Sequence, residues 1–349
     1  MRAHVTEIKP GDVLQTDTFN EYGLHVLPKG TKLGQDDISK LFQFGIDYVD
    51  IEVRQTDITV QTPSSIAENV HKAKASIDQA MDGFEQLFLE ALSTGKINES
   101  VVDDTLEPLV DQLVGQSDVV SLLLMVNDDD DYTYKHSMQV SMLSYYIAGW
   151  LGYSKEEAYA AGKAGYLHDI GKSLIPSEIL KKPGKLTPEE FETMKLHTTY
   201  GYDIIMDSIG DERTALVALQ HHEREDGTGY PKQLREGEIH PFAKITAVAD
   251  VYSAMTSNRI YQSKRELLSV LQEMFELSFG NKLNATATQV FIQHMLPNFI
   301  GKKVVLTNGE TGTIVMTNPA DFFRPLIQTE QRFTDLSKER SIAIERVFI

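Results

Sequence analysis

Five histidines and two aspartates recur along the middle of the chain at intervals of about one helix and one connection. They lie in YKHSM at His136, LHDIG at His168-Asp169, KLHTT at His197, QHHE at His221-His222 and VADVY at Asp250. Successive segments are roughly 24 to 32 residues apart and are flanked by apolar residues at helical spacing. Successive helices could bring all these side chains to one pocket, so the series predicts a helical bundle around a polar centre.

The flanking segments have other patterns. Residues 1–53 indicate a small α+β module, and residues 54–64 indicate a linker. Residues 65–297 are almost entirely helical in pattern, with capping boxes such as Ser154/Glu157 and Thr187/Glu190. Residues 298–349 alternate like short antiparallel strands. We therefore expect a mainly α fold: a helical bundle with a small N-terminal α+β module and a short C-terminal antiparallel β segment.

Charge and composition exclude several classes of protein. The 349 residues include 33 basic and 51 acidic side chains, and the formal net charge of −18 argues against binding to long nucleic acid. Without cysteine, disulfides and thiolate metal sites are excluded. No signal-like segment opens the chain, and no apolar run approaches the roughly 18 to 20 residues that span a bilayer. We expect a cytoplasmic protein without membrane insertion.

The histidines and aspartates have the chemistry of a metal centre. Neutral imidazole and carboxylate suit iron, manganese, zinc and similar divalent ions. Asp169 is the natural bridge between two ions, because its neighbour His168 can bind the same metal. We place His136, His168, Asp169 and Asp250 around one ion, and Asp169, His197, His221 and His222 around the other. Two such ions lower the pKa of a bridging water and hold a phosphoryl group for in-line displacement.

Three longer motifs carry a family resemblance. HDIGK at 168–172, HHEREDGTGYP at 221–231 and ADVYSAMTSNRIY at 249–261 resemble the HD-GYP subgroup of the HD-domain metal-dependent phosphohydrolases, over about residues 120–295. The resemblance implies an all-helical domain with two or three metals, often iron or manganese. It also implies bacterial second-messenger signalling. The expected activity is a phosphodiesterase that hydrolyses cyclic di-GMP to pGpG, GMP or both, with a hydroxide bridging the two ions as the nucleophile.

The resemblance also implies roles for residues outside the ligand set. Lys172 resembles the lysine that contacts phosphate, and with Asp169 it forms the expected catalytic pair. Arg259 resembles an arginine that contacts guanine or phosphate, and Tyr261 is expected to stack nearby.

The GYP loop consists of Gly227, Gly229, Tyr230 and Pro231, and it is expected to hold a shape beside the site. The role of Tyr230 stays open between a structural or partner-docking role and a catalytic one. Glu223 is expected to orient a ligating histidine from outside the ligand set.

Two positions depart from the family pattern. Relatives with a third metal have a glutamate one helical turn before the first histidine, whereas Tyr132 stands there in this chain, next to Asp131. Phenol is a poor ligand for hard metals, so we predict two divalent ions, iron or manganese, unless Asp131 substitutes. Ser253 is expected to face the ligand where some relatives have an acidic residue, which leaves guanine selectivity open.

Alternatives remain open at the level of substrate and assembly. The same site could serve another cyclic dinucleotide such as 3′3′-cGAMP, or the protein could be a cyclic-dinucleotide receptor without turnover. The long helix expected at 66–92 suits either a dimer stalk or a member of the bundle. A homodimer and a signalling-protein partner are both compatible with the sequence.

Overall fold

The structure is a computed structural model that describes most of the chain. The described residues are 2–4, 8, 11–19, 25–34, 37–38, 40–41, 44, 46, 48–52, 63–113, 132–256, 267–318 and 320–348. They fall into two compact units, Met1–Val70 and His71–Ile349.

The N-terminal unit combines short strands with helical turns. Strand β1 (Arg2–His4) pairs with β4 (Tyr48–Asp50), and β2 (Thr18–Phe19) pairs with β3 (His25–Leu27), both antiparallel. Residues 37–38 and 40–41 are helical. The unit has its own apolar cluster, made of Ile8, Leu14, Leu27, Leu33, Leu41, Ile46, Val49 and Ile51. This confirms the predicted α+β character.

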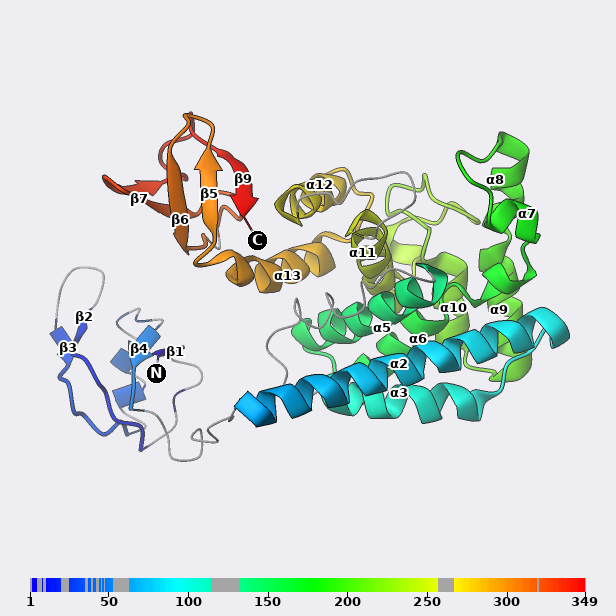
Figure 1. Cartoon of the computed structure of the whole chain (residues 1–349), viewed down its shortest axis with the longest axis horizontal. Helices are drawn as coiled ribbons and strands as arrows, with labels where there is room; N and C mark the ends of the chain where they lie inside the picture. The colour runs from blue at the N-terminus through cyan, green and yellow to red at the C-terminus, as the bar shows by residue number, and fades with distance from the viewer. Residues whose placement is uncertain are drawn as a thin grey trace. The chain divides into compact units, whose positions relative to one another are not determined.

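Helices make up most of the second unit (Figure 1). The longer ones are α2 (Pro63–Thr94), α3 (Glu99–Leu113), α5 (Tyr132–Trp150), α6 (Lys155–Leu167), α8 (Pro188–Lys195), α9 (His197–Ser208), α10 (Glu212–Gln220), α11 (Pro241–Thr256), α12 (Leu267–Phe279) and α13 (Ala285–Met295). Short turns are α7 (Ser177–Leu180), η2 (Ile170–Leu174), η3 (Glu236–Glu238) and η4 (Leu296–Phe299). The capping boxes predicted from Ser154 and Thr187 start α6 and α8 with both reciprocal hydrogen bonds in place. The predicted mainly α fold is confirmed.

Helix α2 belongs to the bundle along its C-terminal half. Ile77, Ala80, Phe84, Leu87 and Ala91 recur every three or four residues and are all fully buried, so they form one apolar stripe. The Phe84 ring meets the Tyr166 ring of α6 edge-on at 5.1 Å, and the Tyr166 hydroxyl donates to the Ala80 carbonyl. Burial of side chains this large contributes about 1.5 to 3 kcal/mol each.

The C-terminal segment forms one antiparallel sheet of five strands in the order β8-β7-β6-β5-β9. The strands are β5 (Lys303–Leu306), β6 (Thr311–Met316), β7 (Leu326–Thr329), β8 (Phe333–Asp335) and β9 (Ile344–Phe348). A turn with Gly309 at φ +84° joins β5 to β6, as the NGE signal predicts. The buried sheet residues Val304, Leu306 and Ile314 belong to the same apolar cluster as the helices.

Among the described residues, no helix is both long and apolar enough to cross a membrane.

Candidate metal centre

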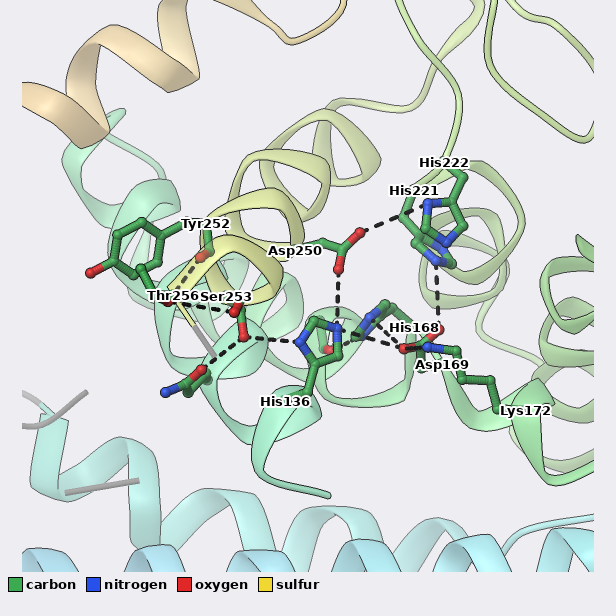
Figure 2. Close-up of polar contacts among 12 residues, drawn as sticks. His136, His168, Asp169, Lys172, His221, His222, Asp250, Tyr252, Ser253 and Thr256 are labelled. Carbon is green, nitrogen blue, oxygen red and sulfur yellow. Dashed lines mark hydrogen bonds and ion pairs between the residues drawn. The ribbon is translucent and has the colours of Figure 1, made fainter. Parts of the chain in front are cut away.

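The structure brings the seven predicted ligands together from five parts of the bundle, and all of them except His197 are labelled in Figure 2. His136 lies on α5, His168-Asp169 follows α6, His197 begins α9, His221-His222 follows α10 and Asp250 lies on α11. Their donor atoms form two groups, each with all atoms within 4.8 Å of one another. One group is Asp169, His197, His221 and His222, and the other is His136, His168 and Asp250.

Asp169 lies between the two groups. Its Oδ2 atom is 3.2 Å from His168 Nε2 and 3.7 Å from His136 Nε2. Its Oδ1 atom is 3.4 Å from His197 Nε2 and 3.8 Å from His221 Nε2. The two oxygens of one carboxylate therefore face different groups of imidazoles, which is the arrangement a bridging ligand requires.

Asp250 faces the same centre from α11. Its Oδ1 is 3.0 Å from His136 Nε2, and its Oδ2 is 3.8 Å from His222 Nδ1. Asp250 therefore contacts one histidine from each of the two groups.

A glycine missed in the sequence sets the position of Asp169. Asp169 follows α6 and is the N-cap of η2 (Ile170–Leu174), which contains Gly171. A Cβ atom on Gly171 would collide with the backbone of His197 and Gly201 on α9. Glycine at 171 therefore lets η2 approach α9 closely, which places Asp169 beside His197. The sequence contains this glycine in HDIGK, but it does not show that Gly171 packs against the backbone of α9.

Hydrogen bonds at Nδ1 orient four of the histidine rings so that their Nε2 atoms face the centre. The Nδ1 atoms of His168 and His197 each lie 2.7 Å from a backbone carbonyl, those of Gly165 and Met194, and His221 Nδ1 lies 2.9 Å from the Ala218 carbonyl. A carbonyl only accepts, so each Nδ1 carries the proton and each Nε2 keeps its lone pair.

Ser253 orients the fourth ring and does not face the ligand side. Its hydroxyl donates to Gln139 Oε1 at 2.8 Å and accepts from His136 Nδ1 at 2.9 Å, with all three side chains buried. The expected ligand-facing position is therefore wrong, because the His136 ring lies between Ser253 and the two aspartates (Figure 2).

Burial and neighbouring charges set the protonation of the centre. Burial lowers the pKa of His197 to about 4 and that of His222 to about 3, and the pKa of His221 also falls well below its ordinary value. Burial opposes ionisation of Asp169, but the charges of His168 and Lys172 hold the pKa of its carboxyl well below the usual range. At neutral pH these groups are neutral imidazoles beside a carboxylate, the forms that bind metal ions.

The remaining protonation states follow the same causes. Burial lowers the pKa of His136, whereas the charges of Asp169 and Asp250 outweigh burial and raise the pKa of His168. Burial again opposes ionisation of Asp250, but its contact with His136 lowers the pKa of the carboxyl.

These residues fit a divalent metal ion. The atoms His168 Nε2 and Asp169 Oδ1 are buried and have no hydrogen-bond partner among the described residues. Leaving such atoms without a partner is costly. A cation that accepts their lone pairs would satisfy both, and the nitrogen and oxygen donor set suits iron, manganese or zinc.

Lys172 lies at the edge of the centre, where its ammonium donates to Asp169 Oδ2 from η2. About a fifth of its side chain is exposed (21%), so its charge lies between the buried carboxylate and solvent. Arg259, Tyr261 and Asp131 lie outside the described residues, as does the side chain of Tyr132. The predicted roles of these four residues remain predictions.

The GYP loop lies beside His222. Gly227 has φ +80°, and a Cβ atom on Gly229 would collide with the backbone of Glu223 and Arg224. The Tyr230 ring lies 4.7 Å from the His222 ring, centroid to centroid, and the Tyr230 amide donates to the His222 carbonyl at 3.2 Å.

Glu223 has a different contact from the one expected. Its carboxylate accepts from the backbone amides of Lys232 at 2.6 Å and Leu234 at 3.0 Å, rather than from a histidine ring. Because the residues after Pro231 turn their amides toward it, Glu223 holds the GYP loop in place and acts on the centre only through that loop.

Comparisons with known proteins agree with this fold. Residues 121–282 match the family model described as HD domain. A cyclic di-GMP phosphodiesterase of Pseudomonas aeruginosa, PA4108, is 29% identical over 272 residues, which are 76% of this chain and 65% of that protein. The 3′3′-cGAMP-specific phosphodiesterase 1 of Vibrio cholerae is 34% identical over 192 residues, 54% of this chain and 44% of that protein. The chain thus spans less than two thirds of the length of these relatives.

One solved structure has a fold similar to that of this chain. Bd1817, an HDG"Y"P protein from Bdellovibrio bacteriovorus, superposes with a TM-score of 0.51 at 16% identity, covering 83% of this chain and 97% of that one. The helical bundle and its histidine-aspartate centre define an HD domain. The GYP loop beside that centre supports a likeness to the HD-GYP group within the HD-domain proteins.

Proposed function

We propose that this protein is a metal-dependent phosphodiesterase that hydrolyses cyclic di-GMP to pGpG, GMP or both. The observation that carries the proposal is the position of Asp169, whose two oxygens face two separate groups of imidazole nitrogens. The names of relatives as phosphodiesterases of cyclic di-GMP and 3′3′-cGAMP support the same substrate class.

We assign two divalent ions, iron or manganese, to the two groups of ligands. His136, His168 and Asp250 would hold one, His197, His221 and His222 the other, and Asp169 would bind both. When bound, such ions acidify coordinated water and neutralise charge on a phosphoryl group.

The protein's own residues would position the substrate and its charge. The four Nδ1 hydrogen bonds hold four of the histidine rings with Nε2 turned toward the centre, the orientation that metal binding requires. Lys172, whose ammonium already lies at Asp169, would donate to a non-bridging phosphoryl oxygen and offset its negative charge. Burial of the centre excludes bulk water and strengthens these interactions.

A test combines metal analysis with product identification. We expect purified protein to contain two equivalents of iron or manganese and to convert cyclic di-GMP into pGpG or GMP. His168→Ala and Asp169→Ala should each remove metal and turnover together, because each deletes a ligand of the centre. Metal-loaded, fully active variants would contradict the assignment.

The alternatives separate in the same assay. The relative that acts on 3′3′-cGAMP makes a parallel assay with that substrate necessary, and faster hydrolysis of it would reassign the substrate. Tight binding of either dinucleotide without products from the metal-loaded protein would indicate a receptor.

A further inference from the structure

A cavity of about 530 Å³ lies between the C-terminal half of α2 and the segment that runs from η2 through α7. Its volume is in the range of ligand pockets, roughly 300 to 1,000 Å³. None of the seven candidate metal ligands lines it, and all the residues that do belong to the unit His71–Ile349. The cavity is therefore separate from the metal centre.

The walls of this cavity are mainly apolar, and three of the side chains are exposed. Leu89 and Leu92 of α2 are 52% and 56% exposed, and Leu174 of η2 is 37% exposed. The rings of Phe88 and Tyr134, whose centroids lie 5.9 Å apart, form the adjoining wall. Exposed apolar side chains that converge on one cavity mark a site for a ligand with an apolar part.

Two polar side chains of the cavity indicate that the ligand is an anion. Lys181 lines the cavity and forms no ion pair with any described residue, and no carboxylate of the described residues lines it. Ser173 is 3% exposed, and its hydroxyl has no hydrogen-bond partner among the described residues, which is costly for a buried group. In a chain with a net charge of −18, a free ammonium beside apolar walls favours an amphipathic anion.

We propose that this cavity binds a free fatty acid, whose carboxylate pairs with Lys181 and whose alkyl chain covers Leu89, Leu92 and Leu174. An apolar chain with a single negative charge matches apolar walls that carry a single unpaired ammonium. The volume is that of a small-molecule site, which favours a free ligand over a second protein. The binding itself does not depend on the proposed phosphodiesterase activity.

The cavity and the metal centre share helix η2. Asp169 is the N-cap of this helix, Lys172 donates to Asp169, and Ser173 and Leu174 line the cavity. A metal ion bound to Asp169 would fix η2 and with it one wall of the cavity, so we expect the metal and the fatty acid to strengthen each other's binding. Such coupling is reciprocal and is typically about fivefold or more. This effect, unlike the binding itself, rests on the proposed metal centre.

The test is calorimetric titration of the full-length protein with decanoate and with 1-decanol, its uncharged analogue. Lys181→Gln should weaken decanoate binding roughly three- to fivefold, the range for an ion pair at an exposed lysine, and should leave 1-decanol binding unchanged. Leu89→Gln should weaken the binding of both ligands roughly tenfold, because each loses an apolar contact. Metal-loaded protein should bind decanoate about fivefold more tightly, or better, than chelator-treated protein.

Lys185→Gln is the matched control, because it removes one positive charge from an exposed position of the same segment outside the cavity. This variant should bind both ligands as the wild type does. The inference is overturned if the wild type binds no decanoate, if Leu89→Gln binds as the wild type does, or if Lys181→Gln and Lys185→Gln lose equally. Sedimentation with phosphatidylglycerol vesicles, without decanoate binding in solution, would assign this face to a membrane surface and overturn it as well.

Failure of the proposed metal centre is distinguishable from failure of this inference. A protein that takes up no metal should still bind decanoate, with the same response to Lys181→Gln. Equal decanoate affinities of metal-loaded and chelator-treated protein would overturn the coupling through η2.

Discussion

At the scale of single residues, Ser253 acts on the centre through the His136 ring, because it contacts Nδ1 and not the Nε2 atom that faces the aspartates. We expect Ser253→Ala to lower metal affinity roughly 10- to 100-fold, because His136 Nδ1 loses the hydroxyl that fixes its ring. A competition titration against a metal chelator measures this.

Ser144→Ala is the control for that variant. Ser144 is equally buried and also links α5 to α11, through Thr246 Oγ1 at 3.4 Å, but it does not contact the centre. Its substitution should cost stability without changing metal affinity. Equal affinities in wild type and Ser253→Ala would show that the ring needs no such support.

The sequence predicted the types and spacing of the ligands but not their directions. Ser253 follows Asp250 by three residues, so both lie on one face of α11, and this much could be read from the sequence. The His136 ring lies between Ser253 and Asp250, with Nε2 at Asp250 and Nδ1 at Ser253. Only the packing of α5 on α11 decides which of the two faces the metal side.

At the scale of elements, the contact between η2 and α9 fixes the geometry around Asp169. Gly171→Ala should force η2 away from α9, because its Cβ would meet backbone atoms that cannot rotate aside. We expect a loss of about 1 to 3 kcal/mol in the free energy of unfolding, together with less than full metal occupancy. Urea unfolding and metal analysis measure the two effects.

A second glycine provides the comparison. Gly149 of α5 has no atom within 4 Å of an added Cβ, so Gly149→Ala should be neutral or stabilising by up to about 1 kcal/mol. Similar losses in both variants would mean that helix propensity, not the close approach of η2, explains the result.

Elements with local signals were predictable and elements with distant partners were not. The capping boxes at Ser154 and Thr187 depend on contacts three residues apart, so the sequence marks the starts of α6 and α8. Strand β9 pairs with β5, which precedes it in the sequence by three other strands, and nothing within the residues of β9 specifies that partner. The loop contact of Glu223 is non-local in the same sense, since its partners lie 9 and 11 residues away.

At the scale of the whole molecule, two separate apolar clusters predict two unfolding events. The N-terminal unit, Met1–Val70, has its own cluster, and the metal centre lies entirely within His71–Ile349. A ligand stabilises only the unit that binds it. Removal of metal should therefore lower the unfolding temperature of the second unit alone.

The single tryptophan makes this prediction measurable. Trp150 lies on α5 in the second unit, stacked on His294 at 4.2 Å and on Tyr146 at 5.7 Å, so its fluorescence follows that unit. If metal is present at about 100 times its Kd, chelation removes about 2.7 kcal/mol of stabilisation, a shift of roughly 5 to 10 °C. Calorimetry of the full chain should show a second transition that chelation leaves in place. One transition that shifts as a whole would mean that the two units unfold cooperatively, and the N-terminal unit would then be energetically coupled to the metal centre.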